Sequence, residues 1–179
     1  MKTPKNHKGI SYIELVIVVL ILCIVAAAAM PMLSSTDPTK LDNAANEVVG
    51  TIRFAQAESI RTKTSYGINT DTTNERIRVY RLSGTTPTYD VYHPIDKKLY
   101  DIQMKTDTYV SGVDLVSTSF DFSGASTSST YLDFSAEGSP KVTSAGVDYM
   151  LTSGTITLSF RSLQRVISIA PITGRVTMQ

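Results

Sequence analysis

The sequence predicts an α+β protein in which one long N-terminal helix packs its second half on an antiparallel β-sheet. Residues 10–33 are almost entirely apolar, and the polar segment after them carries a single apolar stripe at helical spacing. Beyond residue 64 the pattern changes to short alternating stretches separated by Ser, Gly, Pro and Asp, which is typical of strands and turns. Because no helical periodicity returns after that point, we expect the strands to be antiparallel.

Composition limits the protein to one core without covalent cross-links. The 179 residues suffice for one compact domain and one accessory element. The only cysteine, Cys23, lies in the apolar segment, so no intramolecular disulfide can form. Lys2, Lys5 and Lys8 all precede Gly9. Without these three of the 17 basic residues, 14 remain against 16 acidic ones, which gives a net charge of −2. This balance gives no global indication of a polyanion-binding protein.

The first expected element, residues 10–33, is long enough to cross a membrane. A helix rises about 1.5 Å per residue, so this segment spans about 36 Å, against about 30 Å for a bilayer core. Lysines precede it, and the first nine residues contain no acid. The positive-inside rule therefore places the short N-terminal tail in the cytoplasm and the rest of the chain on the other side.

Two other kinds of N-terminal signal compete with a membrane anchor. A secretory signal peptide also begins with a basic and then an apolar region, and Ala27, Ala28 and Ala29 offer an A-x-A cleavage site. A lipoprotein signal needs small residues before its cysteine, whereas Ile21 and Leu22 precede Cys23. We therefore expect the Cys23 thiol to behave as a small buried hydrophobic group.

Glu14 is the one charged residue within the apolar segment. A carboxylate at mid-membrane costs about 2.5 to 3.5 kcal/mol on insertion scales. One interpretation is that Glu14 lies near the cytoplasmic interface, where its side chain reaches water. The other is that its carboxylate pairs with a cation from a neighbouring molecule.

A family resemblance favours the second interpretation. The segment K-G-I-S-Y-I-E-L, residues 8–15, resembles the cleavage and methylation motif of type IV prepilins and pseudopilins. The resemblance implies that a prepilin peptidase cuts between Gly9 and Ile10 and methylates the new amine of Ile10, where the family usually has phenylalanine. It also implies that Glu14 neutralises the amine of a neighbouring subunit during assembly. Such a pair would satisfy two groups that are each costly in lipid.

The same resemblance implies an organisation and a location for the whole chain. Residues 1–9 are a cytoplasmic leader that is removed, 10–33 the transmembrane and filament-core helix, 34–64 its amphipathic second half, and 65–179 a β-rich head. Pro31 stands where the family commonly has a helix-kinking proline. The protein would be a single-pass bacterial inner-membrane protein with a periplasmic head, later incorporated into a pilus-like filament. Its partners would be the peptidase, other pseudopilins or pilins, and an inner-membrane assembly platform.

A second helical segment is expected to begin at Asp37 and Pro38, because Asp is a good N-cap and proline suits the first helical position. Apolar residues then recur at spacings of four and three up to about Thr62. The stripe that should pack on the sheet consists of Leu41, Ala45, Val48, Ile52 and Ala55.

Seven stretches of the remaining chain have the pattern of strands. They are residues 76–82, 89–93, 99–104, 113–122, 130–134, 155–160 and 165–170. The segment 123–129, rich in Ser, Thr and Gly, is expected to be an exposed loop.

Two segments of the head extend the resemblance. F-S-A-E-G-S-P (134–140) and I-S-I-A-P-I-T-G-R-V (167–176) are similar to sheet-and-turn signatures of the GspH/FimT group of minor pseudopilins and minor pilins. The pilin-like fold that this implies agrees with the α+β prediction from the residues. We expect Gly138 and Gly174 to occupy turn positions that need unusual backbone angles.

The inventory of reactive residues argues against an enzyme. His93 is the only histidine after the leader, so no Cys/His metal set can form, and no G-x-S-x-G motif is present. Asn69, Asp71, Asn74 and Glu75 lack the EF-hand spacing and its central glycine, which favours a polar turn over a calcium site. We expect no metal and no cofactor.

DNA binding is an alternative that the sequence supports less well. FimT-type minor pilins involved in DNA uptake carry a C-terminal G-R-x-R signature, and this chain has Gly174 and Arg175 but Thr177 in place of the second arginine. In this alternative Arg161, Arg165 and Arg175 would contact phosphates. A slightly acidic chain with a few arginines would bind DNA weakly and with strong salt dependence, so we expect assembly and not nucleic-acid binding.

The sequence thus predicts a minor pseudopilin of a type II secretion system, which helps to export folded proteins. The missing disulfide and the signatures of the head favour a minor subunit over a major pilin. Two alternatives remain: a minor type IV pilin involved in pilus assembly, adhesion or DNA uptake, and a membrane-tethered periplasmic binding domain that enters no filament.

Overall fold

The computed structural model describes residues 11–33, 36–107, 110–124 and 129–179, with the side chains of 27–37 also outside the description. The chain divides into two units, Met1–Asp37 and Pro38–Gln179, and we treat each by itself. The first unit contains the helix α1 (Tyr12–Leu33), and the second unit is the head.

Helix α1 carries apolar residues on every side, and its large side chains from Tyr12 to Val25 are exposed. In the part of the chain that the structure describes, no helix is both long enough and apolar enough to be a candidate membrane span. The membrane-spanning segment 10–33 therefore stays a prediction from the sequence.

Helix α2 (Thr36–Thr62) supplies the helical side of the core. It begins one residue before the predicted cap Asp37, within the usual uncertainty of helix ends, and it ends at the predicted Thr62. All five residues of the predicted stripe are fully buried. The prediction that this stripe packs on a sheet is confirmed, whereas residues 34–35 between the two helices lie outside the description.

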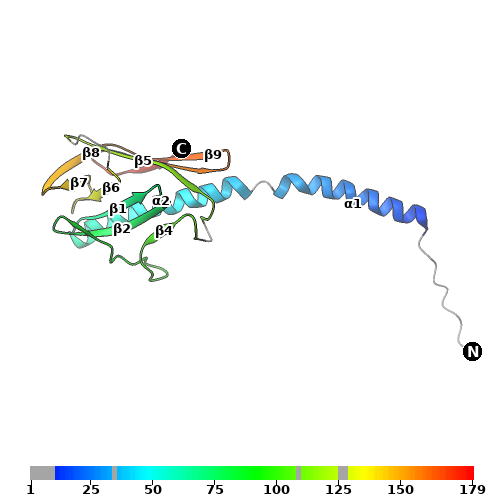
Figure 1. Cartoon of the computed structure of the whole chain (residues 1–179), viewed down its shortest axis with the longest axis horizontal. Helices are drawn as coiled ribbons and strands as arrows, with labels where there is room; N and C mark the ends of the chain where they lie inside the picture. Colours follow the sequence, from blue (N-terminus) through cyan, green and yellow to red (C-terminus); the bar gives the residue numbers. More distant parts are fainter. Residues whose placement is uncertain (1–10, 34–35, 108–109, 125–128) are drawn as a thin grey trace, which may run out of the picture. The chain divides into compact units, whose positions relative to one another are not determined.

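Ten strands follow α2 in the described chain (Figure 1). They are β1 (Tyr66–Asp71), β2 (Arg76–Ser83), β3 (Thr86–Thr88), β4 (Asp101–Gln103), β5 (Asp114–Phe122), β6 (Tyr131–Phe134), β7 (Pro140–Ser144), β8 (Val147–Phe160), β9 (Leu163–Ile169) and β10 (Val176–Met178). Every pairing is antiparallel, as predicted.

The strands follow the order β10-β9-β8-β7-β6-β1-β2-β3, with β4 on β2 and β5 on β8. The long strand β8 connects two groups of strands. Its first residues pair with β7, and its later residues pair with β5 on one side and β9 on the other. The head is therefore built on a continuous ladder in which β8 is shared.

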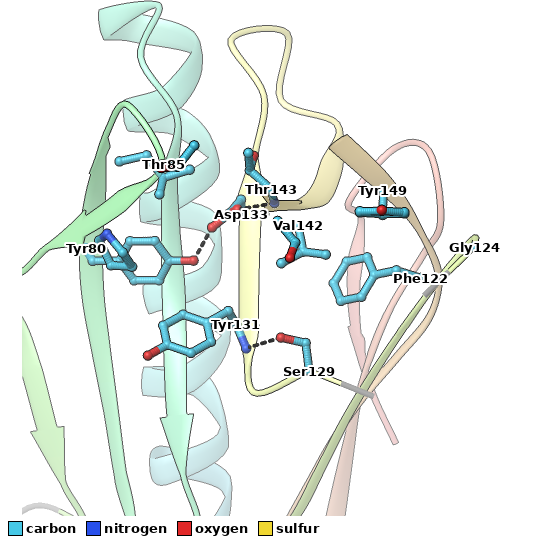
Figure 2. A pocket seen from close by; sticks show the side chains of 13 residues that line it. Tyr80, Thr85, Phe122, Gly124, Ser129, Tyr131, Asp133, Val142, Thr143 and Tyr149 are labelled. Atoms are coloured by element: carbon cyan, nitrogen blue, oxygen red, sulfur yellow. Dashed lines mark hydrogen bonds between the residues drawn. The ribbon is translucent and has the colours of Figure 1, made fainter. Parts of the chain in front are cut away.

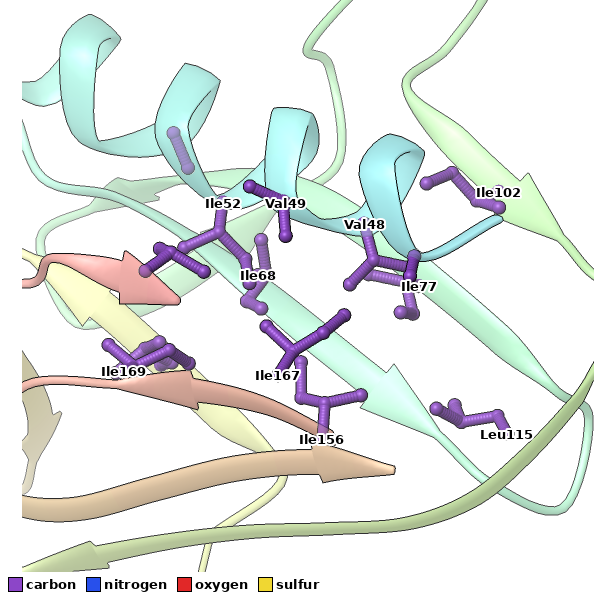
Figure 3. Packing of buried hydrophobic residues seen from close by; sticks show 14 of the residues in the cluster. Val48, Val49, Ile52, Ile68, Ile77, Ile102, Leu115, Ile156, Ile167 and Ile169 are labelled. Carbon is purple, nitrogen blue, oxygen red and sulfur yellow. The ribbon is translucent and has the colours of Figure 1, made fainter. Parts of the chain in front are cut away.

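The core lies between α2 and these strands (Figure 3). Val48, Val49 and Ile52 point from the helix towards isoleucines of β1, β2, β8 and β9. Burying an aliphatic side chain of this size stabilises a fold by about 1.5 to 3 kcal/mol. The stripe on α2 is therefore a principal source of stability of the head.

The predicted strand at residues 89–93 is wrong. This segment forms only an isolated bridge between Tyr92 and Leu99. Its chain turns back at once: the amide of His93 donates to Lys98 O (2.7 Å) and the amide of Lys97 to His93 O (3.1 Å). Pro94 has no amide to donate, which favours a turn here over a strand.

Candidate functional site

The start of α1 presents one carboxylate within an apolar surface. Glu14 lies in the first turn, where the amide of Leu15 donates to Ser11 O (3.1 Å), and its side chain is exposed. A negative charge is favourable at a helix N-terminus because it interacts with the helix dipole. No other acidic or basic residue follows within α1, so Glu14 is the only group on this helix that could recognise a cation by charge.

Three further predicted positions lie wholly or partly outside the described residues. Gly9 and Ile10, the predicted cleavage and methylation positions, fall in the segment 1–10. The backbone of Pro31 belongs to α1, but its side chain is not described. Cleavage, methylation and the helix kink therefore stay predictions.

In the head, one side chain of α2 joins the two turns that carry the family signatures. The Nε2 amide of Gln56 donates to Gly138 O (2.8 Å) and to Thr173 O (2.9 Å). These carbonyls belong to the turn between β6 and β7 and to the turn between β9 and β10. Gln56 thus holds both turns against the same helix.

The glycines of these turns have the backbone angles that the sequence predicted. The φ angle is +86° at Gly138 and +64° at Gly174, in the left-handed region that favours glycine. A Cβ on Gly138 would lie 2.7 Å from Ile60 Cδ1, and one on Gly174 would lie 2.7 Å from Gln56 Nε2 and 3.0 Å from Phe134 Cε1. Both positions therefore require glycine for conformation and for space.

Most of the head is shared with a known family. A family model described as "Type II transport protein GspH" matches residues 44–173. The chain belongs to the GspH family. The matched region holds most of α2, nine of the ten strands and the Gly138 turn, and it ends one residue before Gly174, so the resemblance first noted in the signatures of the head is confirmed.

Two solved structures have a similar fold. The minor pseudopilin EpsH from the type 2 secretion system of Vibrio cholerae matches with a TM-score of 0.50 and 13% identity, over 78% of this chain and 96% of that chain. The type IV minor pilin FimU of Pseudomonas aeruginosa matches with a TM-score of 0.47 and 16% identity, over 80% and 91%. A comparison with curated proteins found no match.

Membership in the GspH family fixes the general class of function. GspH proteins and pilins are structural, non-enzymatic proteins, so this member has a pilin-like role in secretion or pilus assembly. The family also implies assembly with other pilins into a periplasmic pilus-like filament. The antiparallel, pilin-like fold is that of the solved pseudopilin.

The three arginines considered for DNA contact do not form one patch in this GspH-family head. Arg165 Nε donates to Asp42 Oδ1 on α2 (2.7 Å), and the Arg161 guanidinium lies 5.4 Å from the centre of the Phe160 ring. Arg175 is exposed and pairs across from Ala170. Because strands rise about 3.4 Å per residue, Arg165 and Ala170 lie about 17 Å apart along β9.

Of the four polar residues considered for calcium, Asn69 and Asp71 lie in β1, and the Asp71 carboxylate closes the turn 72–75 that follows. Asp71 Oδ1 accepts from the amides of Thr73 (3.1 Å) and Asn74 (3.0 Å), and its Oδ2 accepts from Asn74 Nδ2 (2.6 Å). These bonds, the side-chain bond from Asn74 first, lower the pKa of Asp71. The arrangement is a hydrogen-bonded turn, as the sequence predicted.

Sequence reasoning missed Gln56, although the pattern contained a signal for it. Gln56 follows Ile52 by four residues and therefore lies on the same side of α2 as the apolar stripe. Ser59, at the next position on that side, is fully buried; its hydroxyl donates to the carbonyl of Ala55 and accepts from the amide of Tyr66 (2.9 Å). Polar residues at stripe positions indicate hydrogen bonds to the packed partner.

Proposed function

We propose that this chain is a minor pseudopilin of a type II secretion system, incorporated into the periplasmic pseudopilus that helps to export folded proteins. One observation carries the proposal: the model of a type II transport family matches the head, residues 44–173. The apolar helix that precedes this head supports it. A helix that is apolar on all sides suits lipid or the interior of a helix bundle.

Assembly is the mechanism, and α1 is the element that performs it. Apolar contacts between neighbouring helices would hold the filament together, but such contacts alone give little register along the helix axis. Glu14 would supply the register, because a carboxylate in an apolar bundle is stabilised strongly by one correctly placed cation. The amine of Ile10 on a neighbouring subunit, created by cleavage after Gly9, is that cation in this proposal.

The head would then decide where the subunit stands in the filament. Its apolar helix stripe is already buried, and the turns bound to Gln56 hold the β-hairpins in one arrangement. Before assembly the chain would be a single-pass inner-membrane protein with a periplasmic head, and Pro31 would allow the helix to bend. The prepilin peptidase and the inner-membrane assembly platform would be its partners.

N-terminal mass spectrometry tests the first step. The protein is recovered from membranes of cells with and without the prepilin peptidase. We expect an N-methylated Ile10 in the first cells and Met1 in the second. Met1 in both would contradict the proposal in favour of a plain anchor, and Met30 would indicate a secreted domain.

The role of Glu14 is tested by replacing it with leucine or glutamine. Glu14→Leu removes the charge and the hydrogen bonds, whereas Glu14→Gln keeps the shape and removes only the charge. We expect both variants to be cleaved normally and to be depleted from sheared or cross-linked filaments by tenfold or more, an estimate equal to about 1.4 kcal/mol of lost pairing. Normal incorporation of Glu14→Leu would refute this role.

The choice between secretion and a type IV pilus needs a cellular measurement. Deleting the gene should abolish export of folded proteins and leave twitching and DNA uptake unchanged. The opposite pattern would assign the protein to a type IV pilus, and an intact phenotype in all three assays would favour the membrane-tethered binding domain.

A further inference from the structure

A second feature of the head is a cavity of about 590 Å³ with aromatic walls. It lies on the side of β2 and β6 that carries Tyr80, Tyr131 and Asp133, whereas the alternate residues, such as Val79 and Leu132, belong to the core. Figure 2 shows Tyr80 and Tyr131 on one wall and Phe122 and Tyr149 on the opposite wall. Four aromatic side chains therefore surround one buried acid.

The strand register explains how the acid reaches its position. On β1, Gly67 lies opposite Tyr80 of β2 and opposite Asp133 of β6. Because Gly67 has no side chain, the Tyr80 ring extends across β1 and its hydroxyl donates to Asp133 Oδ1. A Cβ on Gly67 would lie 2.7 Å from Tyr80 Oη and 2.8 Å from Asp133 Oδ1. Three neighbouring strands thus cooperate to place the carboxylate at the floor of the cavity.

Asp133 is buried without a counter-ion of its own among the described residues. Asp133 is 2% exposed, and its Oδ2 accepts a hydrogen bond from the amide of Thr143 (2.9 Å). Lys141 on β7 is close enough to influence the pKa of Asp133, but its ammonium pairs with Asp148 Oδ2 (2.6 Å). Burial raises the pKa of Asp133 by more than its hydrogen bonds and Lys141 lower it. A cation in the cavity would stabilise this carboxylate.

The walls are suited to the same kind of ligand. The faces of aromatic rings attract cations, and a ring of them binds ammonium groups that carry carbon substituents. The head already contains one such contact beside the cavity: the Arg78 guanidinium lies 4.1 Å from the centre of the Tyr89 ring, which packs edge-on against Tyr80. A volume of about 590 Å³ lies within the range of small-ligand sites, about 300 to 1,000 Å³, and exceeds what a bare metal ion needs.

We propose that this cavity binds an organic cation, an ammonium or guanidinium group that lies between the aromatic walls and above Asp133. The group belongs either to a lysine or arginine of a protein that contacts the head, or to a free amine. Uncharged ring compounds would use the aromatic walls equally well, but they would leave the Asp133 carboxylate without a counter-ion. Neither filament assembly nor cleavage is required for this binding.

Isothermal titration calorimetry on the full chain in a non-ionic detergent tests the proposal. The probes are choline and its uncharged carbon isostere 3,3-dimethylbutan-1-ol, which have nearly the same shape. We expect choline to bind and the isostere to bind at least about tenfold more weakly, the size of a well-desolvated contact between a cation and aromatic rings. Equal affinities, or no binding of choline and of the two peptides described below, would overturn the proposal.

Variants locate the binding in this cavity. Tyr149→Leu removes a ring from one wall, whereas Tyr149→Phe keeps the ring and serves as its matched control. We expect Tyr149→Leu to weaken binding of the cation several-fold and Tyr149→Phe to leave it within about twofold.

Asp133→Asn should abolish the preference for choline over its uncharged isostere. Asp96→Asn removes a carboxylate from the other large cavity of the head, and it should change nothing. If Asp133→Asn does not fold, the Tyr149 pair still decides, and equal binding by Leu and Phe would refute the site.

The source of the cation is separated by two further probes. Acetyl-Gly-Lys-Gly-amide and acetyl-Gly-Arg-Gly-amide present the two side chains in a peptide, and spermidine presents a free amine. Tighter binding of a peptide supports a protein partner, and tighter binding of choline or spermidine supports a free amine. Several-fold weaker binding of the preferred probe in Tyr149→Leu, with retention in Tyr149→Phe, would support the same cavity in either case.

Discussion

The two helices of this protein have similar lengths and opposite surfaces. Helix α1 has 22 residues with exposed apolar side chains around its circumference, and α2 has 27 residues with one apolar stripe that is fully buried. Helical geometry is the same in both, so the difference lies in the pattern of side chains. The pattern of α2 is satisfied by strands of the same unit, whereas that of α1 calls for lipid or other helices.

In the proposed function, α2 stabilises the folded head and α1 mediates assembly. Substitutions on the stripe of α2 should change the free energy of unfolding of the head. Substitutions of comparable size on α1 should leave that free energy unchanged and affect only entry into a membrane or filament. The comparison can therefore be tested on one protein with matched pairs of variants.

The largest effect is expected for Ile52→Ala on α2, compared with Val19→Ala on α1. Ile52 is fully buried, and such truncations cost about 2 to 5 kcal/mol of unfolding free energy. Val19 is 51% exposed, and we expect a change within about 0.5 kcal/mol. Urea unfolding followed by tyrosine fluorescence measures both, since the chain has nine tyrosines and no tryptophan. Equal losses in the two variants would contradict the division.

A second pair of variants tests how Gln56 of α2 holds the turns of the head. Gly174→Ala and Gly146→Ala both place alanine at positive φ (+64° and +80°), but only at Gly174 would the new Cβ collide, 2.7 Å from Gln56 Nε2. The strain of the left-handed backbone costs each about 1 to 2 kcal/mol. We expect Gly174→Ala to lose about 1 to 3 kcal/mol more, because Gln56 must move away from the carbonyls that it binds.

The control for this pair is the signal of Gln56 itself. In Gly174→Ala the side-chain amide resonances of Gln56 should shift, and in Gly146→Ala they should stay in place. Equal stabilities of the two alanine variants would mean that the Gly174 turn accepts a Cβ with no added loss of unfolding free energy. Gln56 would then not hold that turn.

The elements with regular patterns were predictable from the sequence. The stripe of α2, the strand β2 and the strand β5 were expected close to their observed bounds, because their alternation or helical spacing is regular. The glycine turns were also expected, since Gly138 and Gly174 follow strand-like stretches, where glycine tolerates the backbone angles of a turn.

The missed strands depend on contacts that no local pattern contains. Strand β1 has glycine and asparagine at outward positions, and these are tolerated because Tyr80 covers Gly67 and Arg78 Nη2 donates to Asn69 Oδ1 (3.1 Å). Strand β8 was expected only from Thr155, whereas it begins at Val147. In the structure Gly154 is a packing position, where a Cβ would lie 3.2 Å from the Ile169 Cβ.

The two candidate sites also differ in how far the sequence predicted them. The N-terminal motif around Glu14 is contiguous and was identified from its residues, although its cleavage lies outside the described chain. The cavity over Asp133 was not anticipated, because Tyr80, Gly67 and Asp133 meet only through the register of three strands. Sequence separations of 13 and 66 residues give no local indication of that register.

The smallest expected effect is a pH dependence of the stability of the head that comes from one of its carboxylates. Burial raises the pKa of Asp148, but hydrogen bonds from Lys141 and Thr143 outweigh it, so the pKa lies below its ordinary value of 3.8. A lowered pKa contributes stability that is present above the pKa of the unfolded chain and is lost as pH falls through the pKa of the folded protein.

Asp133, whose pKa is raised, changes the stability with the opposite sign, so the pH dependence must be compared between variant and parent and not read from the parent alone. We expect Asp148→Asn to be less stable than the parent at pH 7 by less than about 1 kcal/mol, since the Asp148 side chain is 51% exposed. That difference should close as the pH falls through the lowered pKa of Asp148. A difference that persisted in acid would mean that the hydrogen bond from Thr143 to Asp148, and not the ion pair, stabilises the hairpin.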